Sequence, residues 1–381
     1  MIDEQASLPL HIFAAYQPRS LAAGTISDFS GLKFSQGECC EVAPRHADAV
    51  GRIVSLAREH GIPVRTRAQG HSLNGSSVPT QEELLLSTRN FRRVRFEEPG
   101  SVTVGSGVVL WVLQYMLRQH GFDLPVLNDG YPGPSVGGYI SAGGFGPRSA
   151  QFGGFWENVL EIQIVDGLGV IHNIPRDNPV FPWLFGSMGQ LGVMTQAKIK
   201  IIARGNAQAP PYPLGTTIRA PLLGPLRIPP EFATSREERL FWFTLFTPDE
   251  FLDEAHRDLK ALEHNYKSAL RFQERYRYPI RPGGLQVPLV YPFNRSFTAT
   301  GAWGWMQDTR PDSVSGLHSF DREFTLLATS KPHYRRYVQS ELPCGPDIYH
   351  TCLGDETYHA FRGHKLAFDP DNLFNLGSVF V

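Results

Sequence analysis

The chain has 381 residues, of which 41% are hydrophobic and 19% are charged, and its 36 basic and 37 acidic side chains leave a formal net charge of −1. This length is enough to bury a sizeable core and to form two domains. The balanced charge, without a long basic run, excludes electrostatic binding of nucleic acid as the main function.

The N-terminus and the cysteines predict a cytoplasmic protein that binds no metal. The first five residues include Asp3 and Glu4 and lack the pattern of a signal peptide, and the apolar stretch 8–16 is too short to span a membrane. Few cysteines in a long chain fit a reducing compartment, and no Cys-x-x-Cys pair predicts a zinc site. The four are Cys39, Cys40, Cys344 and Cys352.

A strand, a helix and a second strand precede the first informative loop. Residues 34–42 alternate as a strand, residues 47–60 carry one apolar stripe and predict a helix, and residues 62–66 predict the next strand. The loop that follows contains Gly70 and Gly75, which allow unusual backbone conformations, and successive N–H groups in such a loop can surround an anion. On composition alone, a structural turn is the simpler explanation. The loop is Arg67-Ala68-Gln69-Gly70-His71-Ser72-Leu73-Asn74-Gly75.

The next elements are short strands and a helix. Residues 83–87, 92–96 and 101–104 predict strands, and residues 109–120 predict a helix with one apolar face. A second glycine-rich block then spans residues 134–146. Its glycine density predicts backbone packed close to a flat or bulky group, or a series of left-handed turns. The glycines are Gly137, Gly138, Gly143, Gly144 and Gly146.

The second half of the chain is less informative. Residues 158–165, a turn at 166–169 and a return strand predict a hairpin, and the Pro- and Gly-rich segment 203–230 predicts a domain boundary. A strand at 239–246 and a helix at 248–264 follow. No regular set of elements can be assigned between 265 and 345.

Four blocks, in order, resemble one family. The loop at His71 is similar to the Gly-x-Gly-His-Ser loop of FAD enzymes of the vanillyl-alcohol-oxidase or PCMH type. The block 136–146, with Glu157-Asn158-Val159 and Ile164-Val165-Asp166-Gly167 after it, resembles that of cytokinin dehydrogenases and berberine-bridge-type enzymes. Residues 184–195 and 364–374 resemble their Gly-Gly-x-Gly-x-Phe-Gly-Ile-x-Thr segment and their Phe-Asp-Pro-x-Asn-x-Phe ending.

The resemblance implies an α+β fold with a two-lobed FAD-binding domain and a smaller capping domain of sheet and helix. We expect the FAD-binding domain at 1–203, the capping domain at 204–345 and a return of residues 346–381 to the first domain. The resemblance also implies FAD bonded covalently through His71, with no second attachment, because residues 130–133, just before the Val136 block, are Gly-Tyr-Pro-Gly and include no cysteine. The implied cofactor-binding residues are Arg67, Ala68, Gln69, Gly70, His71, Ser72, Asn74, Gly137, Gly138, Ser141, Gly143, Gly144, Gly146, Gly192, Val193 and Asn372.

The expected activity is transfer of a hydride from a small-molecule alcohol or amine to flavin, with electrons passed to O2 or another acceptor. The candidate catalytic groups are Asp129, Tyr131 and Tyr291, because substrate oxidation needs a base for a proton. A solvated turn aspartate and packed tyrosines are the simpler explanations for these residues. Two alternatives stay open: the same scaffold catalysing a biosynthetic step without net redox turnover, and a non-flavin binding protein with structural glycines.

Overall fold

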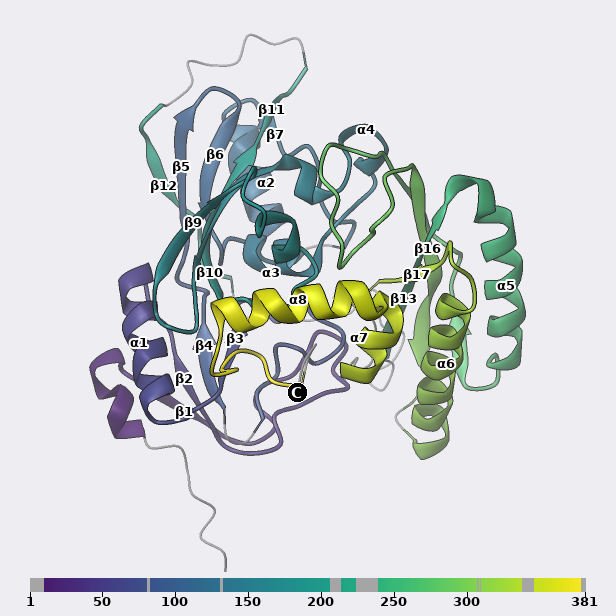
Figure 1. Cartoon of the computed structure of the whole chain (residues 1–381), viewed down its shortest axis with the longest axis horizontal. Coiled ribbons are helices and arrows are strands. Elements are labelled where there is room, and N and C mark those ends of the chain that lie inside the picture. Colours follow the sequence, from purple (N-terminus) through teal and green to yellow (C-terminus); the bar gives the residue numbers. More distant parts are fainter. Residues whose placement is uncertain are drawn as a thin grey trace, which may run out of the picture.

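The computed structural model describes residues 10–80, 83–130, 133–205, 214–223, 239–306, 308, 310–337 and 346–377. Its architecture is α+β, as expected, and the described residues form sheets of four, six, two and five strands (Figure 1). A short 3-10 helix, η1 (Leu10–Tyr16), precedes the first strand. No helix within these described ranges has the length and apolar character needed to cross a membrane.

The first sheet has four strands in the order β1-β2-β4-β3, and β4 runs parallel to both β2 and β3. Helix α1 connects β2 to β3 and buries its apolar stripe on the sheet, so the predicted strand, helix and strand are confirmed. The informative loop therefore leaves the carboxyl end of a parallel strand, where ligands commonly bind in such sheets. The elements are β1 (Arg19–Leu21), β2 (Cys39–Val42), α1 (Ala47–Glu59), β3 (Val64–Arg67) and β4 (Leu84–Ser87).

The second sheet is antiparallel and has six strands in the order β12-β5-β6-β10-β8-β9. The predicted hairpin is confirmed as β8 and β9. Strand β12 lies beyond residue 203 and pairs with β5, so the chain leaves this sheet only after Arg219. The strands are β5 (Arg93–Glu98), β6 (Ser101–Gly105), β8 (Val159–Val165), β9 (Ile171–Pro175), β10 (Val193–Lys200) and β12 (Thr217–Arg219), with helix α2 (Leu110–Gln119) and a separate pair, β7 (Phe122–Asp123) and β11 (Ile202–Ala203).

The glycine-rich block forms a helix, α3 (Val136–Ala142), rather than a series of left-handed turns. The Ser135 hydroxyl caps its first turn by accepting from the Gly138 N–H, and Gly143, with φ of 70°, ends it in the left-handed region. A Cβ on Gly144 would lie 2.1 Å from the Tyr139 ring. Several of these glycines are therefore required by packing within the protein.

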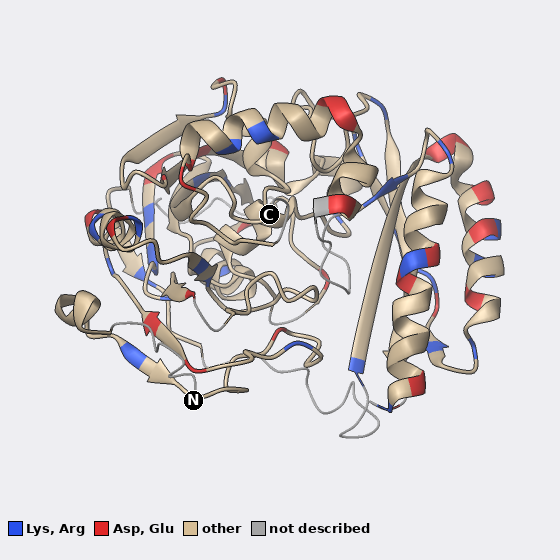
Figure 2. Ribbon diagram, turned by 60° about the horizontal axis from the view of Figure 1, so that its bottom comes forward, with Lys and Arg blue, Asp and Glu red and all other residues tan. Residues whose placement is uncertain are grey.

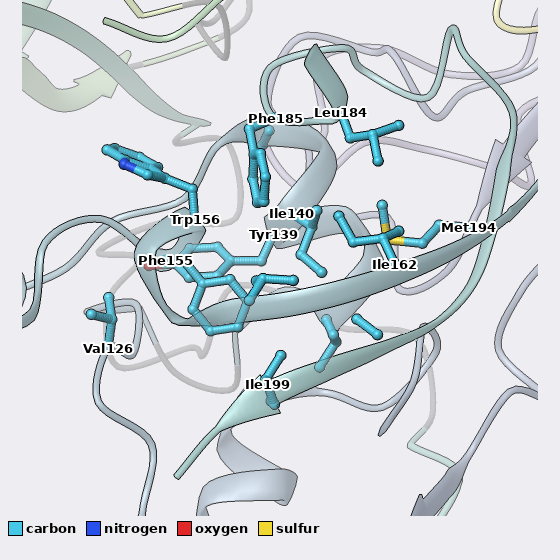
Figure 3. Packing of buried hydrophobic residues seen from close by; sticks show 14 of the residues in the cluster. Val126, Tyr139, Ile140, Phe155, Trp156, Ile162, Leu184, Phe185, Met194 and Ile199 are labelled. Carbon is cyan, nitrogen blue, oxygen red and sulfur yellow. The ribbon is translucent and has the colours of Figure 1, made fainter. Parts of the chain in front are cut away.

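The largest core joins α3 to the six-stranded sheet. Figure 3 shows Tyr139 and Ile140 of α3 among side chains of the sheet and its connections. The Tyr139 and Phe155 rings meet edge to face, 4.9 Å apart. This packing fixes α3 beside the first informative loop. Three short elements complete this region: α4 (Ser149–Phe152), η2 (Phe155–Asn158) and η3 (Phe181–Leu184).

The second half of the chain builds a five-stranded antiparallel sheet in the order β14-β16-β13-β17, with β15 also paired to β16. Helices α5 and α6 cover its outer face at the right of Figure 1. Figure 2 shows acidic and basic residues on these helices, while the long strand beside them is largely uncharged. The elements are β13 (Arg239–Pro248), η5 (Asp249–Phe251), α5 (Leu252–Asn265), β14 (Leu270–Phe272), β15 (Arg277–Ile280), β16 (Phe297–Met306), α6 (Pro311–Thr329) and β17 (Arg335–Arg336).

The last helices, α7 (Pro346–Leu353) and α8 (Asp355–Phe368), bring the chain back to the first sheet. Lys365 on α8 is buried and forms an ion pair with Asp369. The Asp369 carboxylate also accepts the backbone N–H groups of Leu373 and Phe374, 2.9 Å away. The resulting turn places Phe374 beside Val64 at the start of β3.

Candidate functional site

A cavity of about 320 Å³ lies between the first sheet, helix α3 and the five-stranded sheet of β13 to β17. The loop after β3 forms one wall, α3 and the segment 188–194 form the second, and strands β13 and β15 form the third. Two glycine-rich segments far apart in the sequence therefore line one hollow. Its volume is within the usual range for small-molecule sites.

The loop after β3 is held by its own hydrogen bonds. The Arg67 guanidinium donates to the Ser77 carbonyl and hydroxyl and to the Ser27 carbonyl at 2.7–3.1 Å. Burial lowers the pKa of Arg67 to about 10, which still leaves it charged at neutral pH. Gly70 has φ of 68° and a Cβ there would collide with Arg67. The loop therefore needs glycine at this position to fold over the arginine.

His71 lies in the wall of the cavity with its ring stacked on Phe29, 4.3 Å between centroids. Burial lowers its pKa to about 4. The imidazole is therefore uncharged at neutral pH, and an uncharged imidazole nitrogen is a nucleophile and a hydrogen-bonding group.

Hydroxyl groups surround the cavity near the loop and α3. Ser72 and Ser77 share a 3.0 Å hydrogen bond, and Ser106 and Ser135 approach from the other wall. The Ser106 hydroxyl is buried and has no hydrogen-bond partner within the described part of the chain. Gly137 packs directly on Ser106, with its N–H donating to the Ser106 carbonyl at 2.9 Å. This wall offers neutral donors rather than carboxylates.

The returning C-terminal segment reaches the cavity through Asn375. Its Oδ1 accepts the Thr66 N–H at 2.9 Å, and its Nδ2 donates to the Met188 carbonyl at 2.9 Å. One amide thus joins β3 to the segment before β10 and lines the cavity at the same time.

The five-stranded sheet contributes an aromatic wall. Along β13, Leu240, Trp242 and Thr244 face the cavity. The alternate residues Phe241 and Phe243 pack under helices α5 and α6, as strand periodicity requires. Tyr278 of β15, Tyr337 after β17 and Phe145 after α3 complete this wall. The Phe145 ring lies 5.3 Å from Tyr337 and 6.1 Å from Tyr278.

Asp129 is an exposed lining residue of the cavity. Its carboxylate accepts a hydrogen bond from the Tyr278 hydroxyl. Burial and the neighbouring carboxylate raise the pKa of Tyr278 far above its ordinary value. The phenol therefore stays protonated and remains a donor to Asp129.

The structure brings most of the sequence-predicted residues to this cavity. Two predicted glycines, Gly143 and Gly146, instead pack against other parts of the protein. Asn74 and Val193 are buried but do not line the cavity. Asn372 lies in the turn before Leu373. Tyr291 is buried with its ring stacked on Phe297, 3.7 Å away, and Tyr131 lies outside the described residues. The residues in the lining are Asp129, Arg67, Ala68, Gln69, Gly70, His71, Ser72, Gly137, Gly138, Ser141, Gly144 and Gly192.

Sequence reasoning missed the aromatic wall and Asn375. The alternation of residues 239–246 indicated a strand but not which face would meet the cavity. Asn375 follows the recognised Phe-Asp-Pro-x-Asn-x-Phe ending by one residue, and no spacing singled it out. The left-handed backbone of Asn375, with φ of 51°, became evident only from the structure.

Comparison with known proteins relates part of this chain to FAD enzymes. Residues 40–174 match the FAD binding domain, and over this region the chain is similar to PCMH-type FAD-binding oxidoreductases. The family's relatives over this region are enzymes.

Three relatives illustrate the match. D-lactate dehydrogenase of Archaeoglobus fulgidus is 31% identical over 168 residues, which are 42% of this chain and 38% of that protein. Glycolate oxidase subunit GlcD of Bacillus subtilis is 27% identical over 172 residues, 43% of this chain and 37% of the relative. Berberine bridge enzyme-like 23 of Arabidopsis thaliana is 29% identical over 186 residues, 46% and 34% respectively. The match thus covers less than two-fifths of each relative's length.

The residues present fit FAD. A dinucleotide needs hydrogen-bond donors for its phosphates and a broad slot for its ring. The serine-rich loop and the unpartnered Ser106 hydroxyl supply donors in the first half of the cavity. The capping half supplies flat apolar surface.

Proposed function

We propose that the chain is an FAD-dependent oxidase or dehydrogenase of a small-molecule alcohol or amine, with its FAD joined covalently to His71. When bound, FAD accepts a hydride from the substrate and passes the electrons to O2 or another acceptor. The single observation that carries the proposal is the meeting of the His71 loop, α3 and Asn375 around one cavity.

The dinucleotide part of FAD is assigned to the loop side. Ser72, Ser77 and Ser106 present hydroxyls there, and Arg67 adds positive charge beneath the loop. A phosphate is stabilised by such donors without requiring a metal ion. Asn375 joins strand β3 to the segment before β10 through its hydrogen bonds to Thr66 and Met188.

His71 is assigned as the tether. Its ring is fixed against Phe29, and burial holds its pKa at about 4, so the nitrogen lone pair is available at neutral pH. A covalent bond to the flavin requires an unprotonated nitrogen.

The reacting part of the substrate is assigned to the space between Asp129 and the aromatic wall. Asp129 would receive the substrate's proton, and Tyr278 would hold the carboxylate in place. We assign residues 1–203 and 346–381 to FAD binding and residues 204–345 to substrate capping, with β12 as the crossing segment. Relatives named for lactate, glycolate and berberine-bridge chemistry make both hydroxy acids and amines candidate substrates.

The test is the fate of flavin on acid precipitation. Wild-type protein should be yellow, keep its colour in the acid pellet and yield a peptide containing His71 with the mass of an FAD adduct. His71→Ala should release any bound FAD into the supernatant. His60→Ala, which changes an exposed histidine at the end of α1, is the matched control and should behave as wild type. Equal release from wild type and His71→Ala rules out the tether, and a colourless protein that FAD cannot reconstitute rules out the flavoenzyme.

A further inference from the structure

We propose that the substrate half of the cavity selects a flat aromatic molecule with a cationic amino group, and rejects the corresponding carboxylate. This inference rests on the proposed function, because it assigns the substrate to the space between Asp129 and the aromatic wall. It narrows the expected substrates from any alcohol or amine to flat aromatic amines that carry a positive charge.

Aromatic rings that face the cavity favour a flat ligand. Trp242 is stacked from behind on Tyr276, with centroids 4.6 Å apart and planes at 24°. Its position is therefore fixed before a ligand arrives. Phe145, Tyr278 and Tyr337 present further ring surface. Such surfaces bind flat rings by stacking and attract cations through their negatively polarised faces.

The titratable side chains of the cavity favour a cationic ligand near the aromatic wall. Among its described lining residues, Asp129 is the only acidic side chain and Arg67 the only lysine or arginine. Arg67 belongs to the loop side, where its guanidinium is bound to Ser27 and Ser77. His71 is uncharged at neutral pH, because its pKa is about 4. A carboxylate entering beside the aromatic wall would lose water without gaining a cationic partner there, which is costly.

Asp129 supplies the complementary charge for an amine. The Tyr278 hydroxyl binds one carboxylate oxygen, Oδ2. No hydrogen bond to the other oxygen, Oδ1, is found in the described ranges, so this oxygen can accept from an ammonium group. A hydrogen bond between an ammonium and a carboxylate is among the stronger polar contacts. The same carboxylate repels an anionic ligand.

Three probes that share the indole ring but differ in charge separate the contribution of charge from that of ring stacking. We would titrate tryptamine, tryptophol and indole-3-acetate into the purified holoprotein and measure dissociation constants by calorimetry. Tryptamine should bind at least about tenfold more tightly than indole-3-acetate, with tryptophol between them. Asp129→Asn should bring the two constants within about threefold of each other. Asp177→Asn, at an exposed aspartate far from the lining, is the matched control and should keep the preference.

Substitution of Trp242 tests the ring surface separately. Trp242→Leu should weaken all three probes, and Trp242→Phe, which keeps an aromatic face, should retain most of the affinity. The inference is overturned if indole-3-acetate binds as tightly as tryptamine, if Asp129→Asn keeps the preference, or if none of the probes binds. Flavin content is measured first on the same samples. A protein that holds FAD and prefers the carboxylate therefore refutes only the substrate class, whereas a protein without FAD refutes the proposed function.

Discussion

The buried ion pair between Lys365 and Asp369 provides the sharpest test of how the C-terminal segment is held. The two side chains are only 4% and 0% exposed, and Lys365 Nζ also lies 3.1 Å from the Gln190 carbonyl and 3.3 Å from the Phe374 carbonyl. Substitution of Lys365 by methionine keeps much of the volume but leaves a carboxylate buried without its cation.

We expect Lys365→Met to lower the free energy of unfolding by about 3–5 kcal/mol, the usual cost of removing one partner of a buried pair. Asp369 keeps its hydrogen bonds from the N–H groups of Leu373 and Phe374. The loss of unfolding free energy should therefore lie toward the lower end of this range. The double variant Lys365→Met/Asp369→Asn also removes the unpaired carboxylate charge, and it should recover part of the lost unfolding free energy.

The measurement is urea unfolding of the apoprotein, followed by tryptophan fluorescence and circular dichroism. Arg362→Met, on the exposed face of the same helix, is the control and should change stability by less than about 0.5 kcal/mol. In the His71→Ala background, where FAD binds reversibly, Lys365→Met should also lower the FAD affinity, because the turn at Asp369 positions Asn375. A loss no greater than that of the control, or a double variant no more stable than Lys365→Met, would contradict the reasoning.

Three further results are expected. His71 has a folded pKa of about 4 against an ordinary value of 6.5, so the unfolded state binds the extra proton and stability falls as pH drops through that window; urea unfolding of flavin-free protein at pH 7 and 4.5 should show about 2 kcal/mol less loss for His71→Ala than for wild type. Gly144→Ala forces a Cβ to within 2.1 Å of the buried Tyr139 ring and should cost about 1–3 kcal/mol in thermal or urea unfolding, whereas Gly363→Ala, with open space in α8, should be neutral or slightly stabilising. In the His71→Ala background, where FAD binds reversibly, Asn375→Ala should weaken FAD binding by about tenfold or more in an equilibrium titration, with Asn372→Ala having a much smaller effect, because only Asn375 of these two lines the cavity and joins Thr66 to Met188; equal effects of the two would contradict this assignment.

The first half of the fold was predictable because its signals are local. The apolar stripe of α1, the alternation of β8 and the turn after Asp166 each depend on near neighbours in the sequence. These elements were expected at nearly the positions observed. The glycine block is the exception, since Ser135 and Gly143 cap a helix whose interior glycines have low helix propensity. Packing of Gly137 on Ser106 overrides that propensity.

The second half was less predictable because its pairings are long-range. Strand β16 pairs with β13 over ten residues, and α6 packs on that sheet, yet neither element has a strong local signal. In the candidate site, the motif at His71 indicated the loop side from sequence alone. The opposite wall comes from Trp242, Tyr278 and Tyr337, which only the folded chain brings together.

The position of Asn375 has a consequence for biosynthesis. Residues 64–72 are made early, but the amide that bridges Thr66 to Met188 is among the last parts of the described chain to be translated. A nascent chain that has already folded its first sheet still lacks the hydrogen bonds of Asn375. In the His71→Ala background, ribosome-bound chains stalled before residue 375 should therefore lose flavin more readily on washing than chains that extend beyond it.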